Sequence, residues 1–323
     1  MINISGKYST LRTATAAASV RLAPEFIRRI AENRVEKGNV LETARVAGTI
    51  AAKKTSELIP YCHPLPIDEI KLEFKLLDEK IEITSFASAV WKTGIEMEAL
   101  TAAAVAALTI YDMGKSLDAG AVIEEIKLVE KRGGKSDFKE KFSAPLKVCV
   151  LAVSNAAAAG KREDKAGAIV KEMLAGSPVE IAGYEVVPDD AALIKARLLG
   201  WKKAGMDAVF TVGGTGLGAT DVTAEALREV ITTETPGISE AMRAFGQQRT
   251  PYSMFSRSVS GLVGKMLVVA LPGSSRGVKE SLSAILPGVF HAFPMMYGGG
   301  AWQERRAAGK RPGRAAPRPG RSA

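Results

Sequence analysis

The sequence contains 323 residues, of which 46 % are hydrophobic and 24 % charged, as in ordinary globular proteins long enough for two domains. Two cysteines and two histidines are too few for a disulfide framework or a typical zinc site, and no apolar run approaches the roughly 18 residues that a membrane span needs. The net charge is +9, but seven basic residues and one acid fall within residues 299–323, so the rest of the chain is nearly neutral.

The first half of the chain combines helical and strand-like patterns. Residues 24–36 and the alanine-rich residues 98–113 predict two helices, while residues 69–77 and 80–89 predict two strands joined by a tight turn. Apolar and charged residues alternate along the first of these strands, which indicates a sheet with one face in solvent. Helices beside an antiparallel sheet form an α+β domain, to which we assign residues 1–143.

Two stretches in this half carry candidate acid–base groups. His63 directly precedes a proline, which favours an extended backbone and a ring that projects from its loop. A histidine there suits proton transfer near neutral pH, although a purely structural role stays open. Glu96 and Glu98 would point the same way from an extended chain, whereas at a helix start they would instead favour the helix dipole.

A third stretch ends the alanine-rich helix, where Asp112 and Lys115 share a face either as a functional pair or as an ordinary surface ion pair. Glu98 and Asp112 lie fourteen residues apart, which on one helix corresponds to about 21 Å. Side chains that far apart cannot flank one small reacting centre. They either serve different parts of a large ligand or belong to a site that a second subunit completes, and we favour the second interpretation.

Three motifs closely resemble the MoaC family of cyclic pyranopterin monophosphate synthases: PYCHPLPI at 60–67, KTGIEMEALTAAAVAALTIYDMGK at 92–115 and GGKS at 133–136. The resemblance implies a ferredoxin-like α+β fold, a homo-oligomer with its active site between subunits, and no required cofactor. It also implies a lyase reaction, in which 3′,8-cyclo-7,8-dihydro-GTP becomes cyclic pyranopterin monophosphate and pyrophosphate is released. The catalytic residues that it implies are Asp112, Lys115, Lys37 and His63, and the substrate-binding residues are Arg12, Tyr61, Cys62, His63, Glu96, Met97 and Glu98.

The sequence departs from the MoaC pattern at two places. Asn3 stands where the family usually has an aspartate, and Val35-Glu36 stands where a His-His pair often precedes the lysine. We expect both departures to affect the periphery of the site rather than its activity. The reaction needs several acid–base groups for its proton transfers and cations for its triphosphate. The candidate cations are Arg12, Lys37, Lys53 and Lys115.

From residue 144 onward, apolar strand patterns alternate with helical patterns. This alternation predicts βαβ units and an α/β, Rossmann-like domain over residues 144–298. The predicted strands occupy residues 147–153, 180–187, 208–212 and 266–270, and the predicted helices occupy residues 165–175, 191–204, 224–232 and 278–285.

A glycine-rich turn follows the third of these strands, and its backbone amides could bind phosphate. Gly213, Gly214 and Gly216 permit positive φ or close approach, although such a turn is by itself a weak signal. Asp221 is a candidate ligand for Mg²⁺ or for a substrate hydroxyl, with a helix cap as the alternative. Asp189 follows another strand, at the edge where α/β sheets bind their ligands.

Four motifs of this half match, in order, the MogA/MoaB family of molybdopterin-binding proteins: GGTGLGATDVTAEA from 213, PGISEAMR from 236, FSRSVSG from 255 and LPGSS from 271. The resemblance implies molybdopterin binding and, in MogA-type members, its adenylylation with ATP and Mg²⁺. A scaffold that only holds molybdopterin is the alternative, since Asn155 and Ala166 replace a carboxylate and a hydroxyl of the family pattern. The binding residues that it implies are Asp189, Gly213, Gly214, Thr215, Gly216, Asp221, Pro272, Gly273 and Ser274, with Asp221 also as the candidate Mg²⁺ ligand.

Residues 299–323 are rich in arginine, proline, glycine and alanine, which predicts a disordered basic tail. Such a tail could contact nucleic acid, but a solvated extension is the interpretation that we favour. Residues 1–15 lack the apolar core of a signal peptide, so we expect a cytoplasmic protein with no membrane contact.

Overall fold

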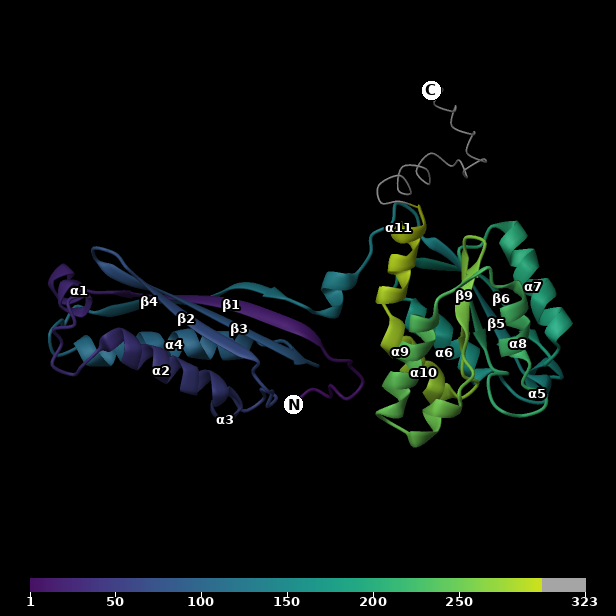
Figure 1. Cartoon of the computed structure of the whole chain (residues 1–323), viewed down its shortest axis with the longest axis horizontal. Coiled ribbons are helices and arrows are strands. Elements are labelled where there is room, and N and C mark those ends of the chain that lie inside the picture. Colours follow the sequence, from purple (N-terminus) through teal and green to yellow (C-terminus); the bar gives the residue numbers. More distant parts are fainter. Residues whose placement is uncertain (298–323) are drawn as a thin grey trace, which may run out of the picture. The chain divides into compact units, whose positions relative to one another are not determined.

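The computed structural model describes residues 1–297, which divide into two compact units, Met1–Phe138 and the chain from Lys139 onward (Figure 1). The predicted basic tail therefore lies outside the described residues. Each unit has a hydrophobic core of its own. None of the helices in the described residues combines the length and the apolar character that crossing a membrane requires.

The first unit packs helices against one face of a four-stranded antiparallel sheet, so the predicted α+β architecture is confirmed (Figure 1). The strand order in this sheet is β2-β3-β1-β4. The elements in chain order are β1 (Thr10–Arg21), α1 (Pro24–Ala31), α2 (Val40–Lys53), α3 (Thr55–Leu58), β2 (Glu69–Leu76), β3 (Lys80–Trp91), α4 (Glu96–Gly114), β4 (Val122–Arg132) and the 3₁₀ helix η1 (Lys135–Phe138).

Two strands of this sheet, β1 and β4, were not predicted from the sequence. The buried face of β1 carries Ala14, Ala16 and Ala18, which pack beneath α4. Alanine has a low strand propensity, so this alternation does not look like a strand in the sequence. Strand β4 is exposed along nearly its whole length and shows no alternation of buried and exposed residues.

The predicted helix at residues 24–36 is wrong in its length. α1 ends at Ala31, and the chain then adopts positive φ at Asn33 (52°) and Gly38 (100°). Left-handed backbone cannot continue a right-handed helix, so these positions form a turn. The separate helix α2 then starts after Asn39, whose side chain accepts a hydrogen bond from a backbone N–H of the first turn at 3.0 Å.

The second unit is a six-stranded sheet with helices on both faces (Figure 1). In the order β6-β5-β7-β10-β9-β8, the first four strands are parallel, while β9 and β8 form an antiparallel edge that was not predicted. Its strands and α-helices are β5 (Leu146–Val153), α5 (Asn155–Ala158), α6 (Lys165–Leu174), β6 (Val179–Val187), α7 (Ala191–Ala204), β7 (Ala208–Val212), α8 (Thr223–Val230), β8 (Thr233–Glu234), α9 (Pro236–Gln247), β9 (Ser260–Val263), β10 (Met266–Leu271), α10 (Ser275–Ile285) and α11 (Ala292–Tyr297).

The order of the parallel strands reverses between β5 and β7. From β5 the chain crosses to β6 on one side and then returns to β7 on the other. The loops that leave the carboxyl ends of β5 and β7 therefore diverge and open a crevice, which is where α/β sheets of this kind bind ligands.

Candidate functional sites

The carboxyl end of α4 brings together three charged side chains that the sequence placed in one site. Lys115 Nζ lies 2.7 Å from Asp112 Oδ1, so the predicted i,i+3 contact forms. Lys37, on the turn between α1 and α2, places its Nζ 3.4 Å from Asp112 Oδ2 and donates to the Asp112 carbonyl oxygen at 2.7 Å. Asp112 is thus a carboxylate between two ammonium groups, and all three side chains are open to solvent.

These contacts fix the charge states of the group. Lys115 first, and then Lys37, lower the pKa of Asp112, while Asp112 raises the pKa of Lys115. At neutral pH the carboxylate is therefore ionised and the Lys115 ammonium is protonated. Within this group the Lys115 ammonium donates the hydrogen bond and the Asp112 carboxylate accepts it.

The amino end of α4 holds a second group of predicted residues. Glu98 is only 3 % exposed, and Cys62 Sγ donates to its Oε1 at 3.6 Å, while no described residue bonds its Oε2. Burial raises the pKa of Glu98, and burial together with Glu98 raises the pKa of Cys62 to about 11. Because α4 begins at Glu96, the extended geometry considered for Glu96 and Glu98 is wrong, and the helix-start alternative is correct.

Beside this group, a cavity of about 120 Å³ is lined by basic and acidic residues. Arg12, 9 % exposed, donates through Nε to the Trp91 carbonyl oxygen at 3.3 Å, and Glu96 pairs with Lys131 at 2.9 Å. Sequence reasoning missed Lys131 and Arg132 in this lining, although they directly precede the GGKS motif that it singled out. The full lining is Arg12, Thr13, Gly94, Glu96, Lys131, Arg132, Gly134, Ser136 and Asp137.

The other predicted residues of the first unit lie near the amino end of α4 or on the loop that follows α3. Met97 and Tyr61 are 36 % and 81 % exposed, and His63 is partly buried. Within one chain, the predicted residues therefore form two separate groups, one at each end of α4. The fourteen residues from Glu98 to Asp112 span about 21 Å of continuous helix.

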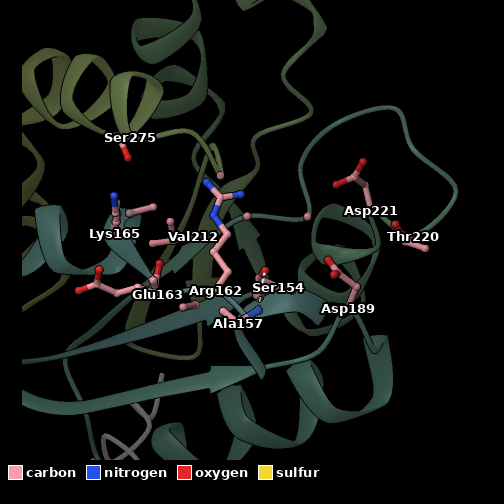
Figure 2. A pocket seen from close by; sticks show the side chains of 17 residues that line it. Ser154, Ala157, Arg162, Glu163, Lys165, Asp189, Val212, Thr220, Asp221 and Ser275 are labelled. Atoms are coloured by element: carbon pink, nitrogen blue, oxygen red, sulfur yellow. Dashed lines mark hydrogen bonds between the residues drawn. The ribbon is translucent and has the colours of Figure 1, made fainter. Parts of the chain in front are cut away.

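The crevice between β5 and β7 in the second unit contains a cavity of about 230 Å³ (Figure 2). Five predicted residues line it: Asp189, Gly213, Gly214, Asp221 and Gly273. The remaining lining residues are Ala152, Val153, Ser154, Ala157, Arg162, Glu163, Asp164, Lys165, Ala166, Val212, Thr220 and Ser275.

Glycine is required where the backbone turns into this cavity. Gly213 has φ of 104°, and a Cβ there would lie 2.3 Å from the Val153 carbonyl oxygen. Gly214 has φ of 64°, and a Cβ there would lie 2.2 Å from Thr223 Oγ1. A side chain at either position would clash with β5 or α8, so the bare backbone forms the floor of the cavity.

The other predicted residues lie beside the cavity. Thr215 is buried at 4 % exposure, and a Cβ added at Gly216 would lie 2.9 Å from Asp221 Oδ2. Pro272 and Ser274 line a neighbouring cavity of about 280 Å³. The hydroxyl of Ser274 caps α10 by accepting a hydrogen bond from a backbone N–H at 3.1 Å.

Three of the four carboxylates that line the cavity accept hydrogen bonds from nearby donors. Asp189 Oδ2 accepts a hydrogen bond from the backbone N–H of Asn155 at 3.0 Å. In return, Asn155 Oδ1 accepts one from the backbone N–H of Asp189 at 3.1 Å. Asp221 Oδ2 accepts from the Gly218 amide at 2.8 Å, and Val222 rather than Asp221 is the N-cap of α8, so the helix-cap alternative is wrong. Asp164 caps α6 and accepts from the Tyr184 hydroxyl at 2.5 Å.

Sequence reasoning missed two cations of the lining, Arg162 and Lys165, whose side chains form no hydrogen bond or ion pair with any described residue. Figure 2 shows Arg162 in the middle of the lining, with Lys165 on one side and Asp189 and Asp221 on the other. Their signal was the charged stretch 161–165 just before α6. The lining thus carries both signs of charge, and these two side chains are the cations that can pair with an anionic group of a ligand.

Comparisons with known proteins give each unit relatives of its own. The MoaC family model matches residues 1–134, and a model described as a probable molybdopterin binding domain matches residues 149–291. A molybdenum cofactor biosynthesis bifunctional protein of Chlorobaculum tepidum is 39 % identical over 93 % of this chain and 95 % of its own length.

Two shorter proteins are similar to one unit each. A cyclic pyranopterin monophosphate synthase of Novosphingobium aromaticivorans is 52 % identical over 42 % of this chain and 87 % of its own length. A crystal structure of the molybdopterin biosynthesis enzyme MoaB from Thermus thermophilus is 43 % identical, covers 47 % of this chain and 97 % of its own, and superposes with a TM-score of 0.46.

Proposed function

We propose that this chain, which belongs to the family of bifunctional molybdenum cofactor biosynthesis proteins, catalyses two reactions of that pathway. The first unit converts 3′,8-cyclo-7,8-dihydro-GTP into cyclic pyranopterin monophosphate and releases pyrophosphate. The observation that carries this proposal is the position of Asp112 between Lys115 and Lys37. Ring opening and reclosure need an acid and a base held together in opposite charge states, and this group provides both.

The remaining predicted residues of the first unit bind the substrate. Arg12 and Lys37 offer positive charge for the triphosphate, and His63 is a further proton-transfer group. The Cys62 thiol, with its pKa raised to about 11, stays protonated and donates to Glu98 Oε1, which leaves Glu98 Oε2, unpartnered among the described residues, to hydrogen-bond the purine-derived ring. No cofactor enters this proposal, since these side chains supply every proton-transfer group that it uses.

A homo-oligomer brings the two groups at the ends of α4 into one active site. An apolar stripe on α4 supports this proposal, because Met97, Leu108 and Tyr111 remain 36 %, 54 % and 38 % exposed. On the neighbouring strand β4, Ile126 and Leu128 are also exposed, at 44 % and 37 %. Exposed apolar side chains on adjacent elements are typical of a surface that a second subunit covers.

The test of the first activity is turnover of the cyclised GTP precursor by wild type and by Lys115→Ala. We expect the variant to lose about 100-fold or more in kcat, because it lacks the acid beside Asp112. Lys80→Ala is the matched control, since Lys80 forms a similar exposed ion pair at 3.1 Å with Glu82 at the β2–β3 turn. An intact wild-type oligomer that makes no cyclic pyranopterin monophosphate would refute the assignment.

The second unit binds molybdopterin and transfers AMP to it from ATP. The cavity between β5 and β7 supports this activity, because it combines the bare backbone at Gly213 and Gly214 with the unpaired cations Arg162 and Lys165. Backbone amides and cations together suit the phosphates of ATP and of the pterin. The alternative is a scaffold that binds molybdopterin without reaction.

Mg²⁺ fits this cavity only as a partner of bound phosphates. No three His, Cys, Asp or Glu side chains within residues 1–297 gather closely enough to hold a metal ion. Asp189 and Asp221 nevertheless both line the cavity, and Mg²⁺ commonly uses one or two carboxylates together with substrate phosphates. Asp221 would hold the ion, and ATP would supply the adenylyl group.

The test of the second activity is AMP transfer to molybdopterin by wild type, Asp189→Asn and Asp221→Asn. Each substitution should lower turnover about 100-fold while leaving the fold intact. Asp190→Asn is the matched control, since Asp190 caps α7 through its Oδ1 and is absent from the cavity lining. Wild type that binds molybdopterin but transfers no AMP would favour the scaffold.

Two further features belong to this proposal. The element order β-α-β-β-α-β, counting α1 to α3 as one helical connection, and the strand order β2-β3-β1-β4 support a ferredoxin-like first unit. Cys62 and Cys149 are both free thiols, which supports a cytoplasmic location, where thiols stay reduced.

A further inference from the structure

We infer that Arg257 is a positioning residue that closes the loop carrying Asp221 and thereby controls adenylyl transfer in the second unit, an inference that rests on the proposed adenylylation. Arg257 lies just before β9 and is not among the residues that line the cavity. Any effect on the reaction must therefore act through another group.

The contacts of Arg257 join the two ends of the loop 215–221, which connects β7 to α8. At the beginning of the loop, its backbone amide donates to the Thr215 carbonyl oxygen at 2.9 Å, and its Nε donates to the Gly216 carbonyl oxygen at 2.6 Å. At the end of the loop, its Nη2 donates to the Asp221 carbonyl oxygen at 2.5 Å. The guanidinium thus bridges residues that lie five apart in the chain.

The same guanidinium is anchored to the helix that follows the loop. Its Nη1 forms an ion pair with the Glu225 carboxylate in the first turn of α8. The guanidinium is planar and its three nitrogens point in fixed directions, so it can satisfy three separate acceptors at once. A lysine at this position has one nitrogen and could not hold both ends of the loop and Glu225 together.

The position of the Asp221 carboxylate depends on this closed loop. Asp221 Oδ2 accepts from the Gly218 amide, and a Cβ at Gly216 or Gly218 would lie only 2.9 or 2.8 Å from that oxygen. The Asp221 carboxylate therefore packs against the backbone of two glycines. These glycines have no side chains that could hold the loop in place. Without Arg257, a loop this rich in glycine gains conformational freedom, and Asp221 loses its fixed place in the cavity.

Three variants test this inference through two independent readouts. In Arg257→Ala, kcat for AMP transfer should fall about 100-fold, since a displaced catalytic group costs roughly that much. Hydrogen exchange of the amides at 215–221 should accelerate in the same variant. Arg257→Lys should show intermediate values for both, because one of the lost contacts can be restored.

Arg228→Ala is the matched control, since Arg228 approaches the same Glu225 carboxylate at 3.8 Å but forms no hydrogen bond or ion pair with the described residues 215–221. It should leave both AMP transfer and loop exchange unchanged. Cyclic pyranopterin monophosphate synthesis by the first unit, which none of these substitutions touches, reports that each chain is assayed at equal concentration.

The outcomes separate this inference from the proposed function. If Arg257→Ala leaves loop exchange at the wild-type rate, or if Arg228→Ala slows AMP transfer as much, the positioning role is overturned. If wild type transfers no AMP yet Arg257→Ala accelerates loop exchange, the adenylylation proposal fails while the structural control of the loop stands. Arg257→Lys serves as the variant that should still fold, because its ammonium group can keep the ion pair with Glu225.

Discussion

At the scale of single residues, charge states follow from neighbours that are distant in the chain. Asp112 is held ionised by Lys115 and Lys37, although all three side chains are exposed. Exposed ion pairs contribute little to folding stability, so loss of any one of the three side chains should cost the first unit little stability. Glu98 shows the opposite case, because its burial favours the protonated carboxyl group.

The thiol of Cys62 should react slowly with iodoacetamide. Its pKa of about 11 leaves few thiolates at pH 8, and the thiolate is the reactive form. Glu98→Gln removes a negative charge that opposes thiolate formation, so the pKa falls and the rate–pH curve moves to lower pH. We expect alkylation at pH 8 to become several-fold faster, measured by mass spectrometry of the Cys62 peptide.

Two internal comparisons decide the outcome of that experiment. Glu96→Gln should accelerate alkylation less, since Glu96 is the weakest of the contributors to the raised pKa of Cys62. Cys149 is fully buried and should stay unmodified in the native protein. An unchanged rate in Glu98→Gln would show that Glu98 does not control the thiol.

At the scale of elements, small side chains set how closely α2 and α4 approach. The two helices make many contacts, and Gly48 of α2 lies where the α2 backbone closely approaches the alanine-rich face of α4. A Cβ at this position would lie 2.8 Å from the Ala102 carbonyl oxygen and 2.9 Å from Leu72 Cδ2. The helix that carries both groups of predicted site residues is therefore fixed by contacts along its middle.

Gly48→Ala should destabilise the first unit by about 1–3 kcal/mol, because an added methyl group forces the two helices apart. Gly200→Ala is the control, since Gly200 also lies within a helix but has open space around its Cβ position. It should stabilise the second unit by roughly 0.5–1 kcal/mol through helix propensity. Urea denaturation measures both, and a loss of stability from both variants would contradict the packing argument.

The sequence was most informative where the determining contacts are local. The spacing of Asp112 and Lys115 predicted their ion pair, and apolar runs predicted every parallel strand of the second unit. Long-range contacts could not be predicted in this way. Lys37 joins Asp112 only because the turn after α1 leads it there, and Arg257 contacts the Asp221 loop only because β9 pairs beside β10.

At the scale of the whole molecule, the two groups at opposite ends of α4 predict that inactive variants can complement each other. Lys115→Ala and Glu98→Ala each remove one group, about 21 Å from the other. If each active site combines the two groups from different subunits, a mixed dimer has one intact site and one doubly damaged site. Random pairing makes about half of the dimers mixed, so co-refolded variants should regain about one quarter of wild-type activity.

The same mixing experiment carries its own control. Lys115→Ala and Asp112→Ala remove residues from one end of α4, so no pairing of these two variants restores an intact site. Turnover of the cyclised GTP precursor measures both mixtures under the same conditions. Recovery in both mixtures would point to reassembly effects unrelated to the site, and recovery in neither would place the complete active site within a single chain. Recovery only in the mixture from opposite ends of α4 follows if two subunits share each site.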